Sequence, residues 1–502
     1  MFGDFNIKDK NILKEISRTP SVKKNFALST AYQILILAVP FVTTPYVSRV
    51  LGADGIGIYS FTSSIASYFT MLAALGTMSY GAREIARARD DRQLLSRLFW
   101  EIETLAVVST MISIVIWTIW VLLAPEYNMI YLILTMTLLG TMTDISWFFT
   151  GLEQFKYIVI RNSIVKIVGV ILLFIFIREK DDLTLYIFLM TLTNLLGALS
   201  MWMYIPKMVD KVEWRTLRIR NHFKETLVYF IPTIATSVYT ILNKVLLGFM
   251  GGDIRENGYF EQATKIIIIG QTLTFTALNS VLGARIAYLF AENKIEEIHQ
   301  RIEKSLNYIL LVGLGLCIGL VAIAPRFVPW FFGPGYEPTI VLIQMLSPIV
   351  LIIGISNCLG SQYYTPAGLR KQSARYIVYG AIENLLLNII LIPYYGAKGA
   401  VIGSLAAEFT ITVLYLYNCK GYMTLQQIVS CGWRKTIAGF VMFGVVWYIC
   451  GVVCNATIAI LSSIVVGSLV YAIILLLLHD RFSLEMVDMV RTKLLLVGNK
   501  DK

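Results

Sequence analysis

Long runs of apolar residues alternate along the chain with short polar segments. The hydrocarbon core of a bilayer is about 30 Å thick, and an α-helix needs about 20 apolar residues to cross it. A scan with windows of that length finds fourteen such runs, which predicts an all-α polytopic membrane protein with 14 transmembrane helices. The predicted spans are residues 26–49, 56–80, 99–123, 129–150, 157–177, 183–205, 225–250, 258–282, 304–324, 338–361, 374–393, 397–418, 436–455 and 458–478.

The composition supports a membrane location. Of the 502 residues, 57% are hydrophobic and only 15% are charged, whereas an ordinary soluble domain carries about 25% charged residues. The chain therefore lacks the charged surface that a set of soluble domains would need. Lipid must cover most of its surface.

The distribution of basic residues predicts the orientation. With the N-terminus in the cytoplasm, the predicted cytoplasmic segments and the adjoining span ends hold 34 of the 43 lysines and arginines, and the external segments and their adjoining span ends hold 6. This asymmetry follows the positive-inside rule and places both termini in the cytoplasm. It also accounts for the net charge of +11 without nucleic acid as a partner.

Two parts of the chain look alike and predict an internal repeat. The turn Gly52-Ala53-Asp54 with the following Gly57 has a counterpart in Gly251-Gly252-Asp253 with Gly258, and residues 81–83 and 283–285 both read Gly-Ala-Arg. Two six-helix lobes related by an axis along the membrane normal would enclose a cavity and transport by rocking. The predicted regions are a cytoplasmic N-terminal segment (1–24), an N-lobe (25–206), a cytoplasmic linker (207–224), a C-lobe (225–420), two further helices (434–478) and a cytoplasmic tail (479–502).

Ionisable residues inside predicted spans are the first candidates for function, because each costs roughly 2.5–3.5 kcal/mol at the centre of a bilayer. Lysines are candidates for binding an anionic substrate, and acids are candidates for coupling or gating. The simpler reading is that some lysines reach outward to the membrane surface or pair along a helix, as Glu261 and Lys265 can. The lysines are Lys166, Lys244 and Lys265, and the acids are Asp144, Glu383 and Glu408.

Other candidates are less specific. Arg49 and Arg285 lie at span ends, where an arginine can grip a phosphate with two hydrogen bonds or can simply anchor the topology. Asn384 and Asn388 add hydrogen-bonding groups of the kind that a sugar would use. Pro40 and Pro232 interrupt the first and seventh predicted spans and act either as hinges or as static kinks. These six residues, together with the lysines and acids above, make up the predicted set of substrate-binding and gating residues.

Several kinds of chemistry have no support in the sequence. No G-x-x-x-x-G-K-[ST] motif is present, so the chain is not itself a P-loop ATPase. The three histidines lie at predicted cytoplasmic ends and predict no metal or proton cluster. No predicted external loop is long enough for the active site of a membrane enzyme. We therefore expect a non-enzyme without cofactors, driven by an H+ or Na+ gradient, by the membrane potential or by the gradient of its own substrate.

Several segments resemble a known family. Residues 45–52 (PYVSRVLG), 55–59 (GIGIY) and 81–86 (GAREIA) are similar to the opening of Wzx-type oligosaccharide flippases. These belong to the multidrug/oligosaccharidyl-lipid/polysaccharide exporter superfamily. Residues 147–153 (WFFTGLE) and 396–403 (GAKGAVIG) are similar to later helix junctions of that family. The resemblance implies a V-shaped, two-lobe fold with a positively charged central cavity.

The resemblance also implies a function. It predicts a flippase that moves undecaprenyl-pyrophosphate-linked oligosaccharide repeat units across the bacterial cytoplasmic membrane by alternating access. Membrane lipids are expected partners, as are a polysaccharide polymerase and assembly proteins. The alternatives are a multidrug/cation antiporter or a lipid-II flippase of the same superfamily and, from another class, a membrane glycan polymerase.

Overall fold

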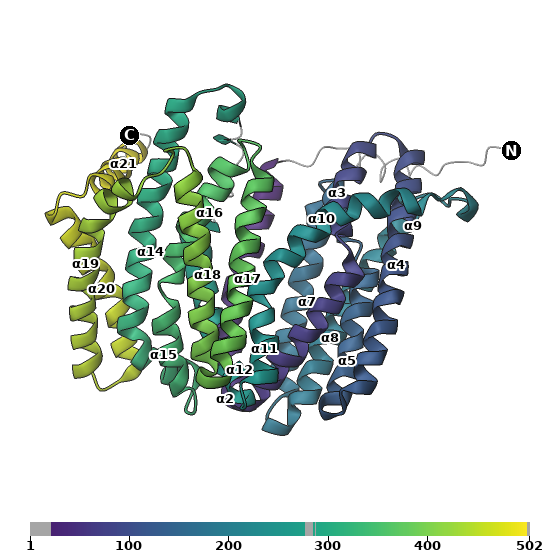
Figure 1. The fold of residues 1–502 in the computed structure, drawn as a ribbon, viewed down its shortest axis with the longest axis horizontal. Coiled ribbons are helices and arrows are strands. Elements are labelled where there is room, and N and C mark those ends of the chain that lie inside the picture. The colour runs from purple at the N-terminus through teal and green to yellow at the C-terminus, as the bar shows by residue number, and fades with distance from the viewer. Residues whose placement is uncertain (1–21, 277–284, 287, 499–502) are drawn as a thin grey trace. The chain divides into compact units, whose positions relative to one another are not determined.

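The computed structural model of the protein describes residues 22–276, 285–286 and 288–498 (Figure 1). Every regular element in these residues is a helix, and the chain divides into two compact units. The first unit comprises residues 1–51 and 62–234, and the second comprises 52–61 and 235–502. The short segment 52–61 therefore belongs to the second unit although it lies early in the sequence, and the change of unit at residue 234 falls within a helix. The domain boundaries expected from sequence stay a prediction.

The first unit is a helical bundle (Figure 1). Within it α5 packs against α4 and α8, and α7 packs against α8. Its helices are α3 (Thr77–Ala88), α4 (Arg92–Leu123), α5 (Asn128–Thr143), α6 (Ser146–Gly151), α7 (Phe155–Phe176), α8 (Leu183–Ser200) and α9 (Ile205–Met208), with parts of α2 (Val22–Ala74) and α10 (Ile219–Thr240). Its 3-10 turns are η1 (Pro125–Tyr127), η2 (Lys180–Asp182), η3 (Met201–Tyr204) and η4 (Trp214–Thr216).

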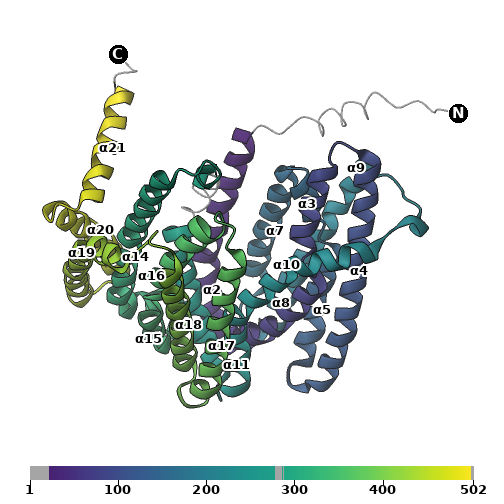
Figure 2. The ribbon, with the colours of Figure 1, turned by 45° about the horizontal axis from the view of Figure 1, so that its top comes forward.

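The second unit is larger. In it α17 packs along α18, α14 packs against α16 and α19, and α19 packs against α20; α21 follows α20 at the end of this unit (Figure 2). Its helices are α11 (Leu242–Met250), α12 (Ile254–Gln271), α14 (Ile295–Phe332), α15 (Glu337–Leu346), α16 (Ile349–Leu359), α17 (Arg370–Tyr395), α18 (Ala397–Asn418), α19 (Leu425–Val452), α20 (Ala456–Leu477) and α21 (Arg481–Gly498), with the π-helical turns η5 (Thr272–Thr276) and η6 (Gly360–Tyr364).

Eleven helices in the described residues are long and apolar enough to cross a membrane. The first, Ala38–Ala88, contains the predicted span 56–80 and the second half of the predicted span 26–49, and Gly52 divides it with a positive φ of 67°. The predicted spans 225–250 and 258–282 are each divided between shorter elements and are not among the eleven. The protein is therefore a multi-pass membrane protein, and the number fourteen stays a prediction.

Lipid-facing surface is most evident on α7 and α20. Only 11% of the apolar window of α7 and 22% of that of α20 is buried inside the protein. Ile164 and Ile171 on α7 are more than half exposed, as are Ile458 and Leu461 on α20. Exposed apolar helix faces of this extent need a hydrocarbon solvent.

The two turns that the repeat relates meet inside the second unit. Gly57 lies against the backbone of Ile254, and Gly258 lies against the backbone of Ala53, so a Cβ on either glycine would overlap a carbonyl group. Such close backbone contact between membrane helices requires small residues at the crossing point. Each of the two glycines that correspond in the predicted repeat therefore contacts the helix that contains the other: Gly57 of α2 contacts α12, and Gly258 of α12 contacts α2.

Candidate functional site

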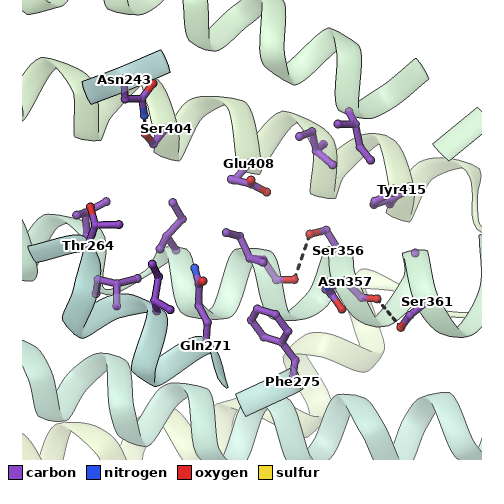
Figure 3. A pocket seen from close by; sticks show the side chains of 18 of the residues that line it. Asn243, Thr264, Gln271, Phe275, Ser356, Asn357, Ser361, Ser404, Glu408 and Tyr415 are labelled. Atoms are coloured by element: carbon purple, nitrogen blue, oxygen red, sulfur yellow. Dashed lines mark hydrogen bonds between the residues drawn. The ribbon is translucent and has the colours of Figure 1, made fainter. Parts of the chain in front are cut away.

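A cavity of about 710 Å³, lined by both apolar and polar side chains, lies inside the second unit (Figure 3). Its walls come from α11, α12, α16, α17 and α18, together with the two π-helical turns. A π-turn widens a helix locally and frees backbone groups, which is common where a helix borders a site. The polar residues that line the cavity are Asn243, Lys244, Thr264, Gln271, Ser356, Asn357, Ser361, Thr365, Ser373, Ser404, Glu408 and Tyr415.

Glu408 supplies the carboxylate of this cavity. Its side chain leaves α18 and is directed into the space bordered by Gln271 of α12 and Ser356 of α16 (Figure 3). The residue is 7% exposed, and within the described part of the chain its carboxylate receives no hydrogen bond and makes no ion pair. A ligand in the cavity can therefore reach this carboxylate without displacing a protein partner.

A cluster of side-chain amides lies at one end of the cavity. Asn243 Nδ2 donates to Ser404 Oγ at 2.7 Å, and Asn388 Nδ2 donates to Asn243 Oδ1 at 2.7 Å and to Asn384 Oδ1 at 3.0 Å. Asn243 and Ser404 line the cavity, whereas Asn384 and Asn388 are fully buried behind them. The two asparagines predicted from sequence therefore support the cavity wall, and their neighbours present the polar surface.

The two candidate lysines of the second unit, Lys244 and Lys265, share one carboxylate. Lys244 Nζ lies 2.6 Å from Glu261 Oε2, and Lys265 Nζ lies 3.4 Å from Glu261 Oε1. Ser60 Oγ also donates to Glu261, at 3.1 Å. Two cations on one anion leave a net charge of +1, and Lys244 is the member that lines the cavity.

The charged candidates of the first unit gather near the break between α5 and α6. Asp144 ends α5, accepts a hydrogen bond from Ser146 N at 2.9 Å and lies 3.4 Å from Arg161 NH1. Lys166 is half-buried on α7, one to two turns further along, and forms no ion pair with any carboxylate that the structure describes. Glu103 on α4 is 3% exposed.

A second polar network in the first unit involves a histidine. His222 Nδ1 and Tyr80 Oη lie 2.6 Å apart, and His222 Nε2 lies 2.7 Å from Glu101 Oε2. Arg97 Nε and the backbone N–H of Arg218 both donate to Glu101 Oε1. His222 is buried, with 7% of it exposed, because its two ring nitrogens contact Tyr80 of α3 and Glu101 of α4.

The remaining predicted residues are not among those that line the cavity. Glu383 borders an open, mostly apolar groove of about 340 Å³ on α17. Arg49 is exposed on α2, and Arg285 is exposed with its guanidinium 5.3 Å from the Tyr288 ring. Pro40 lies within α2, which continues through it as helix, and Pro232 lies within α10, where its side chain falls outside the described part of the structure.

Sequence reasoning missed several of these groups. Glu101 and Glu103 lie inside the predicted span 99–123, so the criterion that selected Glu408 would also have selected them. Asn243, Gln271 and Ser404 are uncharged, and nothing in a single sequence distinguishes them from other polar residues in membrane helices. Only the packing of α11, α12 and α18 shows that these three residues share one cavity.

The fold and the cavity together define a class, namely multi-pass helical membrane proteins with polar groups enclosed between their spans. A family model described as polysaccharide biosynthesis protein matches residues 22–290. The chain therefore belongs to the polysaccharide biosynthesis protein family, which the sequence motifs had indicated.

Named relatives are similar to the chain in sequence, and solved structures are similar to it in fold. The chain is 26% identical over 401 residues, 79% of its own length and 96% of the relative's, to an Escherichia coli (strain K12) protein named "Putative O-antigen transporter". It is 27% identical over 231 residues, 44% of its length and 46% of the relative's, to the Haloferax volcanii "Probable low-salt glycan biosynthesis flippase Agl15". The fold is similar to that of the lipid II flippase MurJ in an inward closed conformation, with a TM-score of 0.61, 16% identity, and 86% of this chain and 97% of that chain covered. It is also similar to an inward-facing MATE multidrug transporter, with a TM-score of 0.58, 14% identity and coverages of 78% and 98%.

Proposed function

We propose that this chain is a flippase that moves lipid-linked oligosaccharide repeat units across the cytoplasmic membrane by alternating access. The observation that carries the proposal is membership of the polysaccharide biosynthesis family together with similarity along nearly the whole length of a relative named as an O-antigen transporter. In this proposal the chain is a transporter and not an enzyme. It lies in the inner membrane with both termini in the cytoplasm.

The cavity chemistry suits a glycan attached to an anionic lipid. Hydroxyl and amide side chains, which both donate and accept hydrogen bonds, are the groups that match sugar hydroxyls. The trio of Lys244, Glu261 and Lys265 keeps a net positive charge that favours a pyrophosphate. The exposed apolar faces of α19 and α20 offer a surface for a polyprenyl tail.

Energy and partners follow from the same proposal. No P-loop is present in the sequence, so an H+ or Na+ gradient is the proposed source of energy. The lipid-linked glycan would come from glycosyltransferases on the cytoplasmic side. A polymerase and assembly proteins would receive the translocated repeat units.

Deletion of the gene tests the function directly. We expect loss of surface glycan and accumulation of lipid-linked repeat units that an external glycosidase cannot reach. A plasmid copy should restore both, and the double variant Asn243→Ala, Ser404→Ala should restore them poorly, because it removes a polar wall of the cavity. Ser462→Ala is the control, since the Ser462 hydroxyl bonds only within its own helix. Unchanged surface glycan in the deletion strain would contradict the proposal, and single repeat units on the surface without longer chains would indicate a polymerase.

The predicted residues outside the cavity need a separate test. Lys166→Gln and Glu383→Gln, made singly, should each lower surface glycan if these residues act on substrate or coupling ion. Full restoration by both variants would remove Lys166 and Glu383 from the mechanism and leave the cavity residues as the site.

Glu408 favours one second candidate, a cation antiporter. An acidic side chain that faces a cavity without a cationic partner can bind an organic cation. Expression in a strain sensitive to cationic dyes distinguishes the two functions. Resistance that Glu408→Gln abolishes would favour the antiporter, whereas unchanged sensitivity together with restored glycan favours the flippase.

A further inference from the structure

Glu103 is an acidic side chain that is buried inside a membrane span and has no hydrogen-bond or ion-pair partner in the described part of the chain. It lies on α4, is 3% exposed, and both of its carboxyl oxygens are shielded and without a hydrogen bond to any described residue. The cavity site does not include it, since it belongs to the first unit and the cavity belongs to the second.

The charged groups around Glu103 do not compensate a negative charge. Asp144, at the break between α5 and α6, is close enough to repel it electrostatically. Arg161 of α7 is engaged by Asp144 at 3.4 Å. On α4 itself, Arg97 and Glu101 pair with each other, and on α3 the arginines Arg83 and Arg87 pair with Glu84.

Three of the segments packed nearby carry no charge, since α5, α6 and the segment 62–74 of α2 contain no acidic or basic residue. α10 does carry charge, and its His222 contacts Glu101 of α4 at 2.7 Å. Among the described residues Glu103 makes no ion pair, and the charged neighbour that acts on it is the carboxylate of Asp144.

Enclosure without a partner favours the neutral form of such a side chain. An isolated buried carboxylate costs many kcal/mol and takes up a proton instead, whereas a protonated carboxyl group without a partner costs about 1–3 kcal/mol. Proton uptake forms an O–H bond on one Glu103 oxygen with a proton from water. Release breaks that bond, returns the proton to water and leaves the carboxylate.

The helix break next to Glu103 is a place where the surroundings of this carboxyl group can change. Asp144 leaves helical geometry with φ −80° and ψ 97°, so α5 and α6 join through two non-helical residues. Broken helices in membrane proteins adopt alternative arrangements at ion and substrate sites. If Arg161 moves from Asp144 toward Glu103, or if water enters the break, the carboxylate form of Glu103 is stabilised and the proton leaves.

We propose that Glu103 is a proton-binding site of the first unit, and that its proton, exchanged as the Asp144–Arg161 pair rearranges, couples the H+ gradient to transport. The coupling part rests on the proposed flippase function, whereas the presence of the proton does not. In this proposal the first unit binds the driving ion, and the second unit holds the cavity that we propose for the glycan.

Infrared spectroscopy of the purified protein in lipid nanodiscs tests the proton without any substrate. We expect the C=O stretch of a protonated carboxylic acid, shifted in D2O, in the wild type at neutral pH. Glu103→Gln should remove this band, because glutamine copies the shape of the neutral acid but carries no titratable proton. Glu126→Gln, at an exposed position in the same unit, is the matched control and should keep the band. A spectrum that Glu103→Gln leaves unchanged would overturn the proposal.

Transport tests the coupling. Proteoliposomes with a pH-sensitive dye in the lumen receive lipid-linked glycan extracted from the deletion strain. We expect proton movement with the wild type and with Glu126→Gln, and at least about a tenfold loss of it with Glu103→Gln. Proton movement by Glu103→Gln at the wild-type level would show that the residue is a structural acid and not the coupling site. If the deletion strain keeps its surface glycan while the infrared result is as expected, the flippase proposal fails and the proton site stands.

Discussion

Glu408 and Glu103 are both buried acidic residues in membrane helices, but their surroundings differ between the two units. Glu408, in the second unit, opens onto a cavity of about 710 Å³ lined with hydroxyl and amide groups. Glu103, in the first unit, has both oxygens enclosed by protein. A carboxylate that faces a cavity can be solvated or bound by a ligand, whereas an enclosed one must be neutral or paired.

The same contrast extends to the neighbours of these acids. Behind the cavity wall, the side-chain amides form only some of the hydrogen bonds that they could form. Asn388 Nδ2 donates to Asn243, but Asn388 Oδ1 and Asn384 Nδ2 have no hydrogen-bond partner among the described residues. The enclosed side has either complete networks, such as His222 with Glu101 and Tyr80, or the lone Glu103. Enclosed polar groups should therefore be sensitive to loss of a partner, and cavity-facing groups should be tolerant in stability but sensitive in function.

The largest effect is expected at a fully enclosed ion pair near the C-terminus. Lys435 is 0% exposed, and its Nζ lies 2.9 Å from Asp480 Oδ2. Asp480→Ala leaves a buried ammonium without its carboxylate, which should lower the free energy of unfolding by about 3–5 kcal/mol. Denaturant titration in detergent measures this change. The control is Glu485→Ala, which breaks the exposed pair with Arg481 and should cost about 0.5 kcal/mol or less; equal losses would show that enclosure does not matter.

The same pair predicts a dependence on pH. Burial opposes ionisation of Asp480, but hydrogen bonds from Lys435 and Ser483 outweigh it and hold the pKa of this carboxyl below its usual value. A lowered pKa in the folded state gives stability that is complete above about pH 4, the usual range for aspartate, and that is lost as pH falls through the lowered pKa. The stability difference between wild type and Asp480→Asn should stay constant from neutral pH down to that range and shrink below it. A difference that grew on acidification would contradict the assignment.

An intermediate effect is expected where the amide cluster meets α18. A Cβ on Gly403 would lie 2.5 Å from Asn388 Oδ1 and 3.4 Å from Asn384 Nδ2. Gly403→Ala should therefore displace the amides and cost about 1–3 kcal/mol, as overpacking does, together with loss of transport. In the control Gly444→Ala, nothing lies within 4 Å of the new Cβ, so the variant should be neutral or slightly stabilised by helix propensity.

A smaller loss is expected in the enclosed network of the first unit. Tyr80→Phe removes the hydroxyl that meets His222 Nδ1 and leaves a buried ring nitrogen without its partner. The cost should be about 1 kcal/mol, seen as a lower midpoint of thermal unfolding. Tyr448→Phe, at a residue that is 69% exposed, should leave the midpoint unchanged, and a similar drop in both would place the effect outside the network.

The smallest change in stability is expected at the cavity. Gln271 lines it, so Gln271→Ala leaves no enclosed partner behind and should alter the free energy of unfolding by less than about 0.5 kcal/mol. Surface glycan in the complemented deletion strain should nevertheless fall. A variant that lost stability but kept full transport would reverse the contrast between cavity-facing and enclosed groups.

Much of the helical fold could be predicted from the sequence, because few backbone structures are stable inside a bilayer. Apolar runs of about 20 residues must be helices, since no water satisfies their backbone groups, and the described residues are helical in these regions. The motifs around Pro45–Gly52 and Gly81–Ala86 also indicated the family that the comparison shows. Several interruptions were not foreseen, among them those at Asp144, at Ile241 and at Thr272, because a helix break of one or two residues hardly changes the hydropathy of a span.

The candidate site divides in the same way. Sequence alone selected Glu408 and Lys244 because charge inside an apolar run is visible without a structure, and both line the cavity. Only the tertiary structure decided that Lys244 and Lys265 share Glu261, that Asn384 and Asn388 stand behind Asn243 and Ser404, and that Glu103 is enclosed beside Asp144. Membership of a helix follows from local hydropathy, but a side chain's partners and its access to solvent depend on which distant helices pack against that face.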